Sequence, residues 1–292
     1  MPKRILIQLD CDPQPSTFDS IVAVDAGAEV LLRHGGVTPD SVVGLVHGAM
    51  FTRAVSDLAS TAIFIGGSNV VAADAVAAKV RQTFFGPLQV GVLVDPSGAN
   101  TTAAAAVILA FCHIPAGGKE QAVVLGGAGA VGLRVARLLA RRGLRVMIAS
   151  RALDRAVTAA DAIREQVPGA QVRGIESHGT VSAGSPLADV LSGADLVIAA
   201  GAAKANLLDE TGRTLVSNAR VLIDLNAVPP AGIHGIVVGD KGRVDGKAFC
   251  YGALGVGGTK MAIHRAAIER IFRDPKAHLD AEECMAIGEA VT

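Results

Sequence analysis

Residues Gln121–Arg151 read QAVVLGGAGAVGLRVARLLARRGLRVMIASR and contain the strongest indication of the fold class. The apolar run Ala122–Leu125 predicts a strand, and the glycines that follow it have the spacing G-x-G-x-x-G. An amphipathic helix to about Arg142 and a second apolar strand at Arg145–Ala149 complete the unit. A strand, a glycine turn and a helix in this order predict a dinucleotide-binding site.

The glycines of this turn have separate roles. Gly127 allows a sharp bend after the strand, Gly129 removes a side chain where a pyrophosphate approaches the backbone, and Gly132 lets the helix pack close to the strand. The first helical residues, Ala130 and Val131, then present N–H groups and a partial positive charge to the phosphates. The alternative is a purely structural turn, because a chain with 34 glycines can contain this spacing by chance.

The end of the second strand predicts which dinucleotide binds. NAD sites place Asp or Glu there, roughly 20 residues after the glycines, to bind the ribose 2′-OH. This chain has Ser150 and Arg151 at that place, with Arg155 about one turn later. Arg151 can donate two hydrogen bonds to a 2′-phosphate, so the residues favour NADP. NAD remains possible if both arginines are solvated charges at a helix start.

Composition excludes several classes of function. The 292 residues suffice for two domains, and 27 basic residues balance 27 acidic ones, which argues against a nucleic-acid partner. The four cysteines are scattered without a CxxC pair, so neither a disulfide framework nor a metal site is expected. We expect no signal peptide in the start MPKRILIQLD, because acidic residues end its apolar run early, and the low-charge stretch Thr101–Ile114 is too short to span a bilayer. We therefore expect a cytoplasmic protein with no membrane partner.

Strands and helices alternate along the chain, which predicts an α/β fold. Before the segment Pro115–Lys119, which we interpret as a domain junction, the expected strands are Arg4–Leu9, Ser60–Ile65 and Gln89–Val94. A helix opening at Ser20–Asp25 is expected to end near His34, and Val42–His47 is a short apolar segment. Further helices are expected at 72–84 and after the segment Asp95–Thr102, which opens an Ala-rich helix to about Cys112.

The second half predicts a Rossmann-type, doubly wound parallel sheet beside a smaller α/β domain, with a cleft between the two. Its strands are expected at Ala122–Leu125, Arg145–Ala149, Val172–Ile175, Asp195–Ala200, Val221–Leu225 and Ala248–Tyr251. The segment Gly252–Lys260 is expected to open a helix that ends near Phe272, and a last helix is expected at Ala281–Ala290, both crossing back onto the first domain. The predicted domains are thus 1–114 with 259–292, and 115–258.

Three further segments combine glycine with polar residues at strand ends or helix starts, where α/β folds bind ligands: Asp10–Asp25, Asp95–Thr102 and Gly252–Lys260. Each also has a structural interpretation, since an acid or threonine there can cap a helix. Lys260 differs, because we expect it at a helix start, where the helix dipole disfavours a cation.

The chain resembles the NADP-dependent methylene-tetrahydromethanopterin dehydrogenases of methylotrophs over essentially its whole length. The resemblance is carried by FDSIVAVDAGAE, STAIFIGGSN, FFGPLQV, SGANTTAAAA, VVLGGAGAVGLR, LNAVPPAGIHG and GALGVGGTKMAIHRA, of which SGANTTAAAA and GALGVGGTK are the most distinctive. It implies reversible hydride transfer from methylene-tetrahydromethanopterin to NADP in one-carbon metabolism. No proton moves at the reacting carbon, so catalysis would consist mainly of aligning two flat rings.

The resemblance also implies roles for residues. Lys260 would orient the pterin, and residues 1–114 with 259–292 would form the pterin domain. The expected pterin ligands are Asp19, Asp25, Asp95, Asn100 and Thr102. Besides the glycine turn and the two arginines, Ala200 and Asn226 would contact the cofactor, Asn226 at the nicotinamide carboxamide. A homo-oligomer is implied, and specifically a trimer.

Three other functions stay open at this point. A methylene-tetrahydrofolate dehydrogenase would differ only in the carrier. A relative of shikimate dehydrogenase would need a Lys–Asp pair near residues 65–105, where Asp74, Lys79 and Asp95 do not form an obvious pair. A non-catalytic NADP-binding regulator would need no second polar cluster, so SGANTT and GGTK argue against it.

Overall fold

The chain folds into two compact units, residues 1–101 with 261–292 (unit 1) and residues 102–260 (unit 2). The structure is a computed structural model, and it describes residues 2–115, 120–177, 181 and 184–292. The predicted junction Pro115–Lys119 falls mostly outside the described residues. Two helices, α4 (Ala99–Phe111) and α9 (Ala253–Arg273), each run through a boundary between the units. The observed boundaries therefore lie inside helices, where no linker composition marks them.

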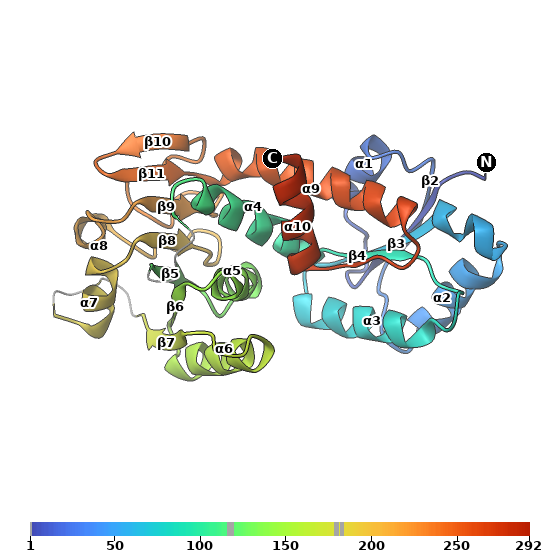
Figure 1. Ribbon diagram of the computed structural model, residues 1–292, viewed down its shortest axis with the longest axis horizontal. Helices are drawn as coiled ribbons and strands as arrows, with labels where there is room; N and C mark the ends of the chain where they lie inside the picture. The colour runs from blue at the N-terminus through green and yellow to red at the C-terminus, as the bar shows by residue number, and fades with distance from the viewer. Residues whose placement is uncertain (1, 116–119, 178–180, 182–183) are drawn as a thin grey trace. The chain divides into compact units, whose positions relative to one another are not determined.

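Unit 1 is built on a five-stranded parallel sheet with the order β12-β4-β3-β1-β2. In Figure 1, α2 and α3 cover one face of this sheet, while α1 and α9 lie on the other. The buried side chains between the sheet and α2 and α3 form one apolar core. The elements are β1 (Ile5–Asp10), α1 (Thr17–Asp25), β2 (Val30–His34), α2 (Val42–Phe51), η1 (Val55–Ser60), β3 (Thr61–Gly66), α3 (Val70–Thr83), β4 (Gly91–Val94), η2 (Pro96–Gly98), β12 (His278–Leu279) and α10 (Ala281–Val291).

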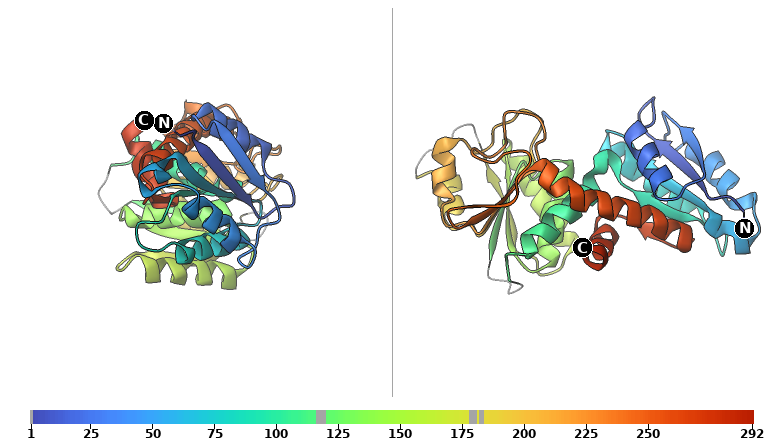
Figure 2. Two further views of the ribbon diagram at one scale, coloured as in Figure 1. Left: turned by 90° about the vertical axis from the view of Figure 1, so that its right-hand side faces the viewer. Right: turned by 90° about the horizontal axis from the view of Figure 1, so that it is seen from above.

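Unit 2 is built on a seven-stranded sheet with the order β10-β11-β9-β8-β5-β6-β7. Six strands are parallel and β10 pairs antiparallel to β11 at one edge. Figures 1 and 2 show α5 and α6 on one face and α7 and α8 on the other. The elements are β5 (Gln121–Leu125), α5 (Ala130–Arg141), β6 (Arg145–Ser150), α6 (Leu153–Gln166), β7 (Val172–Glu176), α7 (Pro186–Ser192), β8 (Leu196–Ala199), α8 (Glu210–Leu215), β9 (Val221–Asp224), β10 (Lys241–Asp245) and β11 (Ala248–Tyr251).

The predicted α/β class and the doubly wound sheet are confirmed, because the parallel strands are covered by helices on both faces. The predicted cleft stays a prediction. Among the described residues, no helix is both long and apolar enough to cross a bilayer.

The helix expected from Ser20 to about His34 is wrong in its second half. Helix α1 ends at Asp25, and Gly27 follows with φ +91°, a left-handed conformation that stops a helix. Residues Val30–His34 then pair in parallel with β1 as an edge strand. The short apolar segment at Val42–His47 proves to be the first half of α2. Two strands at sheet edges, β10 and β12, were not predicted.

Candidate functional site

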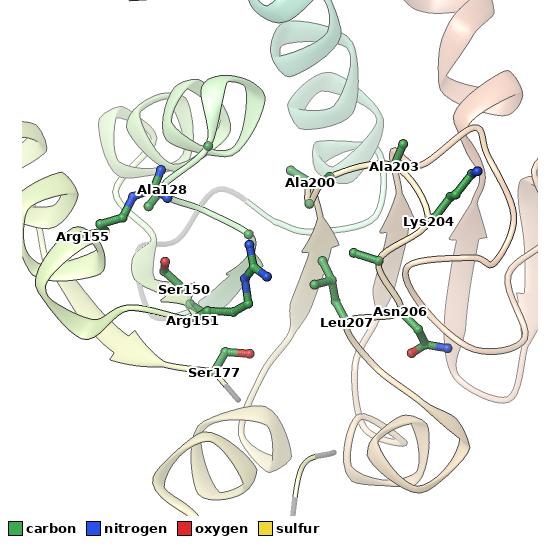
Figure 3. Close-up of a pocket in the computed structure, with 16 residues that line it drawn as sticks. Ala128, Ser150, Arg151, Arg155, Ser177, Ala200, Ala203, Lys204, Asn206 and Leu207 are labelled. Atoms are coloured by element: carbon green, nitrogen blue, oxygen red, sulfur yellow. The ribbon is translucent and has the colours of Figure 1, made fainter. Parts of the chain in front are cut away.

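Unit 2 contains a cavity of about 560 Å³ at the carboxyl ends of its central strands (Figure 3). Strand β5 has β6 on one side and β8 on the other, so the chain reverses its winding direction at β5. Ligands bind to doubly wound sheets at this switch point. The described residues that line the cavity are Gly126, Ala128, Gly129, Ala149, Ser150, Arg151, Arg155, Ser177 and residues 200–207.

The glycine turn brings two backbone segments into direct contact beneath the cavity. Gly126 has φ +69°, and a Cβ atom there would lie 2.7 Å from the Cα atom of Gly201. A Cβ atom on Gly132 would lie 2.7 Å from the carbonyl oxygen of Gly126, so α5 packs directly onto the turn. Gly129 lines the cavity as the N-cap of α5, and its cap has no side-chain hydrogen bond. The first N–H groups of α5 are therefore not capped by a side chain at the point where a phosphate would approach.

The charged residues of the cavity are cationic. Ser150 ends β6, and Arg151 and Arg155 follow it in the cavity wall. Figure 3 shows the guanidinium group of Arg151 pointing into the cavity and that of Arg155 pointing toward Ala128. No Asp or Glu is among the described residues that line the cavity. A group with negative charge therefore meets attraction there and no carboxylate repulsion.

The loop after β8 forms the opposite wall, and sequence reasoning missed all of it except Ala200. Lys204 lines the cavity in a left-handed conformation, with φ +66°, together with Asn206 and Leu207. Ser177, after β7, was also missed. No motif marks these residues. The available signal was topological, since each follows a parallel strand at the same sheet edge as the glycine turn.

Asp224, at the end of β9, holds this wall in place. Its carboxylate accepts hydrogen bonds from the backbone N–H groups of Asn226 (3.0 Å), Gly232 (2.7 Å) and Ile233 (3.2 Å). The carbonyl oxygen of Gly232 accepts in turn from Leu207 and Leu208, each at 2.9 Å. Burial raises the pKa of the Asp224 carboxyl group, although the three backbone hydrogen bonds act in the opposite direction. Asp224 thus connects the end of β9 to the wall of the cavity.

Asn226 follows β9 closely, as predicted, and its contact with the nicotinamide stays a prediction, whereas Lys260 lies further inside its helix than predicted. The Asn226 amide donates to the carbonyl oxygen of Pro230 at 3.0 Å and accepts from the Val228 N–H at 3.1 Å, so it folds the loop after β9. Lys260 is the eighth residue of α9, because the helix begins at Ala253. It lies about 10 Å along the axis from the helix start, so the argument from the helix dipole was wrong.

The glycines before Lys260 belong to the helix. A Cβ atom on Gly255 would overlap the carbonyl oxygen of Asp240, at 1.8 Å, so this glycine lets α9 pack against the preceding turn. Cβ atoms on Gly257 and Gly258 would meet nothing within 4 Å. Glycine in a helix interior costs about 1 kcal/mol relative to alanine. Packing therefore explains Gly255, whereas Gly257 and Gly258 leave an open helix surface close to Lys260 in sequence.

In unit 1, Asp95 caps the start of α4. Its fully buried carboxylate accepts from the backbone N–H groups of Asn100 (2.9 Å) and Thr101 (3.1 Å) and from the Thr101 hydroxyl group (2.6 Å). The buried Asn100 amide donates to the carbonyl oxygen of Val94. Thr102 is half-buried in the first turn of α4. These contacts support the structural interpretation of Asp95 and Asn100.

The other predicted acids lie on or near α1. Asp19 is half-buried in the first turn, and its N–H donates to the hydroxyl group of Ser16, the N-cap, at 3.2 Å. Asp25 is exposed at the last residue of the helix, about 9 Å further along the axis. Asp10 is buried and accepts from the backbone N–H groups of Asp12 and Ser16. The structure therefore does not bring Asp19 and Asp25 together.

The fold and cavity define a class, the two-unit α/β proteins with a Rossmann-type nucleotide-binding unit. Among solved structures, quinate dehydrogenase from Corynebacterium glutamicum in complex with NAD has this fold, with a TM-score of 0.52 and 16% identity over 99% of both chains. Across the residues that the structure describes, no group of three His, Cys, Asp or Glu side chains could hold a metal ion.

Sequence comparison places the chain more narrowly. The family model "Methylene-tetrahydromethanopterin dehydrogenase, N-terminal" matches residues 17–97. Two relatives come from Methylorubrum extorquens. The bifunctional protein MdtA is 41% identical over 99% of both chains, and the NAD(P)-dependent methylenetetrahydromethanopterin dehydrogenase is 33% identical over 89% of both. The chain belongs to the methylene-tetrahydromethanopterin dehydrogenase family. Shikimate dehydrogenase from Halorubrum lacusprofundi matches only 40% of the chain, at 42% identity.

We expect Asp224→Asn to weaken dinucleotide binding, although Asp224 itself does not line the cavity. The amide replaces one of the accepting oxygens by an N–H donor that faces backbone donors, which should lower the free energy of unfolding by about 1–3 kcal/mol. The loop that carries Leu207 should loosen as a result. Denaturant unfolding and calorimetric titration with NADP measure the two effects. Asp189→Asn, an exposed acid on α7, is the matched control. Unchanged NADP affinity in Asp224→Asn would contradict the role.

Proposed function

We propose that the protein catalyses reversible hydride transfer from methylene-tetrahydromethanopterin to NADP, giving methenyl-tetrahydromethanopterin and NADPH. The proposal is carried by the match to two family members over most of the chain, together with a cavity suited to a dinucleotide in unit 2. A cytoplasmic location and assembly into a homo-oligomer belong to the proposal. An exposed apolar stripe on α1, formed by Phe18, Ile21 and Val24, supports self-association.

The cavity suits NADP at the two places where phosphate groups would bind, the pyrophosphate and the 2′-phosphate. The glycine turn keeps side chains away from the place where the pyrophosphate would bind, and α5 begins there without a side-chain cap. Arg151 and Arg155 would hold the 2′-phosphate, since guanidinium groups match phosphate oxygens geometrically. Ser150 and Ser177 add hydroxyl groups near the same end. NADP is therefore the preferred cofactor of this proposal, and NAD the weaker alternative.

Catalysis in this proposal is positioning. When bound, the nicotinamide supplies the acceptor carbon for the hydride, and the nitrogen lone pairs of the pterin stabilise the cation that is left. No proton is transferred at carbon, so the chain needs no general acid or base there. The contribution of the chain is to fix the orientation of the rings and to exclude water.

Lys260 and Gly257, which lies one turn before it on the same side of α9, are the proposed pterin-positioning surface. The open helix surface at Gly257 offers room for a flat ring, and no packing requirement explains this glycine. The Lys260 ammonium group would donate a hydrogen bond to the pterin away from the reacting carbon, because a cation directly over that carbon would repel the developing charge. Of the acids on α1, Asp19 is the better candidate for the amino edge of the pterin, since it is half-buried and Asp25 is exposed.

The proposed reaction predicts a clear order of carriers. Absorbance of the reduced nicotinamide should rise on mixing the protein with NADP and methylene-tetrahydromethanopterin, and more slowly with methylene-tetrahydrofolate. Shikimate should give no signal. Activity with shikimate alone would favour that alternative, and NADP binding without turnover of any carrier would favour a regulator. Faster turnover of the folate carrier would replace the proposed substrate by its alternative.

The two arginines predict cofactor preference. Arg151→Ala should lower kcat/KM for NADP roughly 10- to 100-fold, because hydrogen bonds to charged groups are worth about 1.5–3 kcal/mol. The value for NAD, which lacks the 2′-phosphate, should change by less than about threefold. Lys247→Ala, an exposed cation on the turn between β10 and β11, is the control. An equal loss with both cofactors would contradict 2′-phosphate recognition by Arg151.

The open face of α9 predicts opposite effects on stability and rate. Gly257→Ala should raise the free energy of unfolding by up to about 1 kcal/mol and lower kcat/KM for the pterin, because the new methyl group occupies open space on the Lys260 side of α9. Gly48→Ala in α2, which is equally uncrowded, should stabilise without slowing the reaction. Lys260→Met should lower kcat while NADP affinity is kept. Unchanged rates in both α9 variants would rule out this surface.

A further inference from the structure

The sheet of unit 1 has a switch point of its own. Strand β1 has β3 on one side and β2 on the other, so the chain reverses its winding direction at β1. Helix α1 lies on one face of this sheet, and α2 and α3 lie on the other (Figure 1). Ligands bind to doubly wound sheets at such a point, beyond the carboxyl ends of the strands. In unit 1 these ends are Asp10 of β1 and Gly66 of β3, which are paired in register.

The side chain of Asp19 reaches this switch point from α1. A Cβ atom on Gly66 would lie 3.8 Å from Oδ2 of Asp19 and 3.4 Å from Oδ2 of Asp10. The first turn of α1 is held there by its N-cap, because the hydroxyl group of Ser16 accepts from the Asp19 N–H at 3.2 Å. The acid that the proposed function assigns to the amino edge of the pterin therefore lies where the topology of unit 1 favours a ligand.

A buried carboxylate fixes the loop between β1 and α1. Asp10 is only 1% exposed, and it accepts hydrogen bonds from the N–H groups of Asp12 (2.9 Å) and Ser16 (3.0 Å). The carbonyl oxygen of Asp12 accepts in turn from the Gly36 N–H at 2.7 Å. The loop is thus held at its start and at its end. These contacts set the direction of the Asp12 side chain and of the first turn of α1.

The Asp12 side chain joins this loop to the turn after β3. Its two carboxylate oxygens accept from the N–H group and from the hydroxyl group of Ser68, each at 2.8 Å. The two segments also approach closely at Gly67, which has φ +115° and where a Cβ atom would lie 3.0 Å from the backbone nitrogen of Cys11. Hydrogen bonds to a carboxylate are stronger than those to a neutral acceptor. Asp12 therefore holds the carboxyl ends of β1 and β3 together.

We propose that Asp12 is a positioning residue for the pterin, an assignment that rests on the proposed function. By holding Ser68, Asp12 keeps the turn after β3 against the loop after β1. This contact fixes the place of Gly66 relative to the Asp19 carboxylate, and Asp19 contacts the pterin. The part of Asp12 is geometric, since it requires two hydrogen bonds at the correct spacing and no negative charge. The acids at the end of β1 thus act through Asp19 and not on the substrate directly.

Steady-state kinetics of the full-length protein with NADP and methylene-tetrahydromethanopterin test the assignment. Asp12→Ala should raise KM for the pterin roughly tenfold, because Asp19 is misplaced, and lower kcat by less than about threefold. Asp12→Asn should restore KM, since its amide can accept from the Ser68 N–H and donate to the Ser68 hydroxyl group. NADP affinity should stay unchanged in both variants, because the cofactor cavity lies in unit 2.

Glu29→Ala is the matched control at the amino edge of the same sheet. The Glu29 carboxylate accepts from the Arg4 N–H at 2.8 Å, and these residues directly precede β2 and β1. The variant removes the same kind of contact at the other end of β1, so KM for the pterin should not change. A further readout needs no substrate. Amide hydrogen exchange of residues 66–69 should be faster in Asp12→Ala than in Asp12→Asn.

A double variant tests whether Asp12 acts through Asp19. In an Asp19→Asn background, Asp12→Ala should raise KM little further, because both changes remove one contact with the pterin. Fully additive effects would overturn the assignment. So would an unchanged KM in Asp12→Ala, a KM in Asp12→Asn as high as in Asp12→Ala, or an equal rise in Glu29→Ala.

Failure of this assignment can be distinguished from failure of the proposed function. If the unaltered protein reduces NADP with none of the carriers, the proposed function fails and the role of Asp12 fails with it. If the unaltered protein is active, and Asp12→Ala shows faster exchange at residues 66–69 with an unchanged KM, the contact with Ser68 is structural. The positioning role is then refuted alone.

Discussion

The direct contact between two backbone segments, at Gly126 and Gly201, is the constraint on which the nucleotide cavity depends. A Cβ atom on Gly126 would come within 2.7 Å of the Gly201 backbone. There is therefore no room for a side chain on Gly126 between the turn after β5 and the loop after β8. At this place the cavity is bordered by backbone, which suits a ligand that binds through phosphates. Asp224 secures the same loop from the other side through Gly232 and Leu207. The backbone that follows β5 and β8 thus shapes the cavity, and β9 supports it from behind through Asp224.

Where the fold could be predicted from sequence, burial on both faces of a strand was the reason. Strands β5, β8 and β9 are continuous apolar runs because both faces of the sheet are covered, and such runs are recognisable. The missed strands lie at edges. The strand Val30–His34 pairs with one neighbouring strand, and its apolar residues continue the helical spacing of the apolar residues in α1. Lys241–Asp245 is mostly exposed and polar, and it pairs only with β11. These segments form strands because of the strands they pair with, and the local sequence does not indicate those partners.

Residues of the candidate site were predictable only where chemistry requires a local motif. The glycine turn and the pair Arg151 and Arg155 follow from the strand–turn–helix order, whereas Lys204 and Ser177 share a cavity with them through topology alone. Sequence cannot separate a helix cap from a ligand, since both put an acid before a helix, and Asp95 is a cap. For Lys260 the helix start was placed too close to the lysine, since α9 already begins at Ala253. The sequence around Lys260 is compatible with a lysine at a helix start and with a lysine inside a helix, and only the observed start of α9 distinguishes the two.

The chain order of the two units has a consequence for synthesis on the ribosome. Unit 2 is one continuous segment, but the sheet of unit 1 gains its β12 edge only when His278 and Leu279 pair with Val92 and Leu93. During translation, β4 can pair with β3 early, but its second neighbour, β12, is synthesised about 185 residues later, after the whole nucleotide-binding unit. Nascent chains would expose the β4 edge throughout that interval. Helix α10 directly follows β12 in the chain, so unit 1, whose synthesis begins first, receives its last helix only after unit 2 has been made.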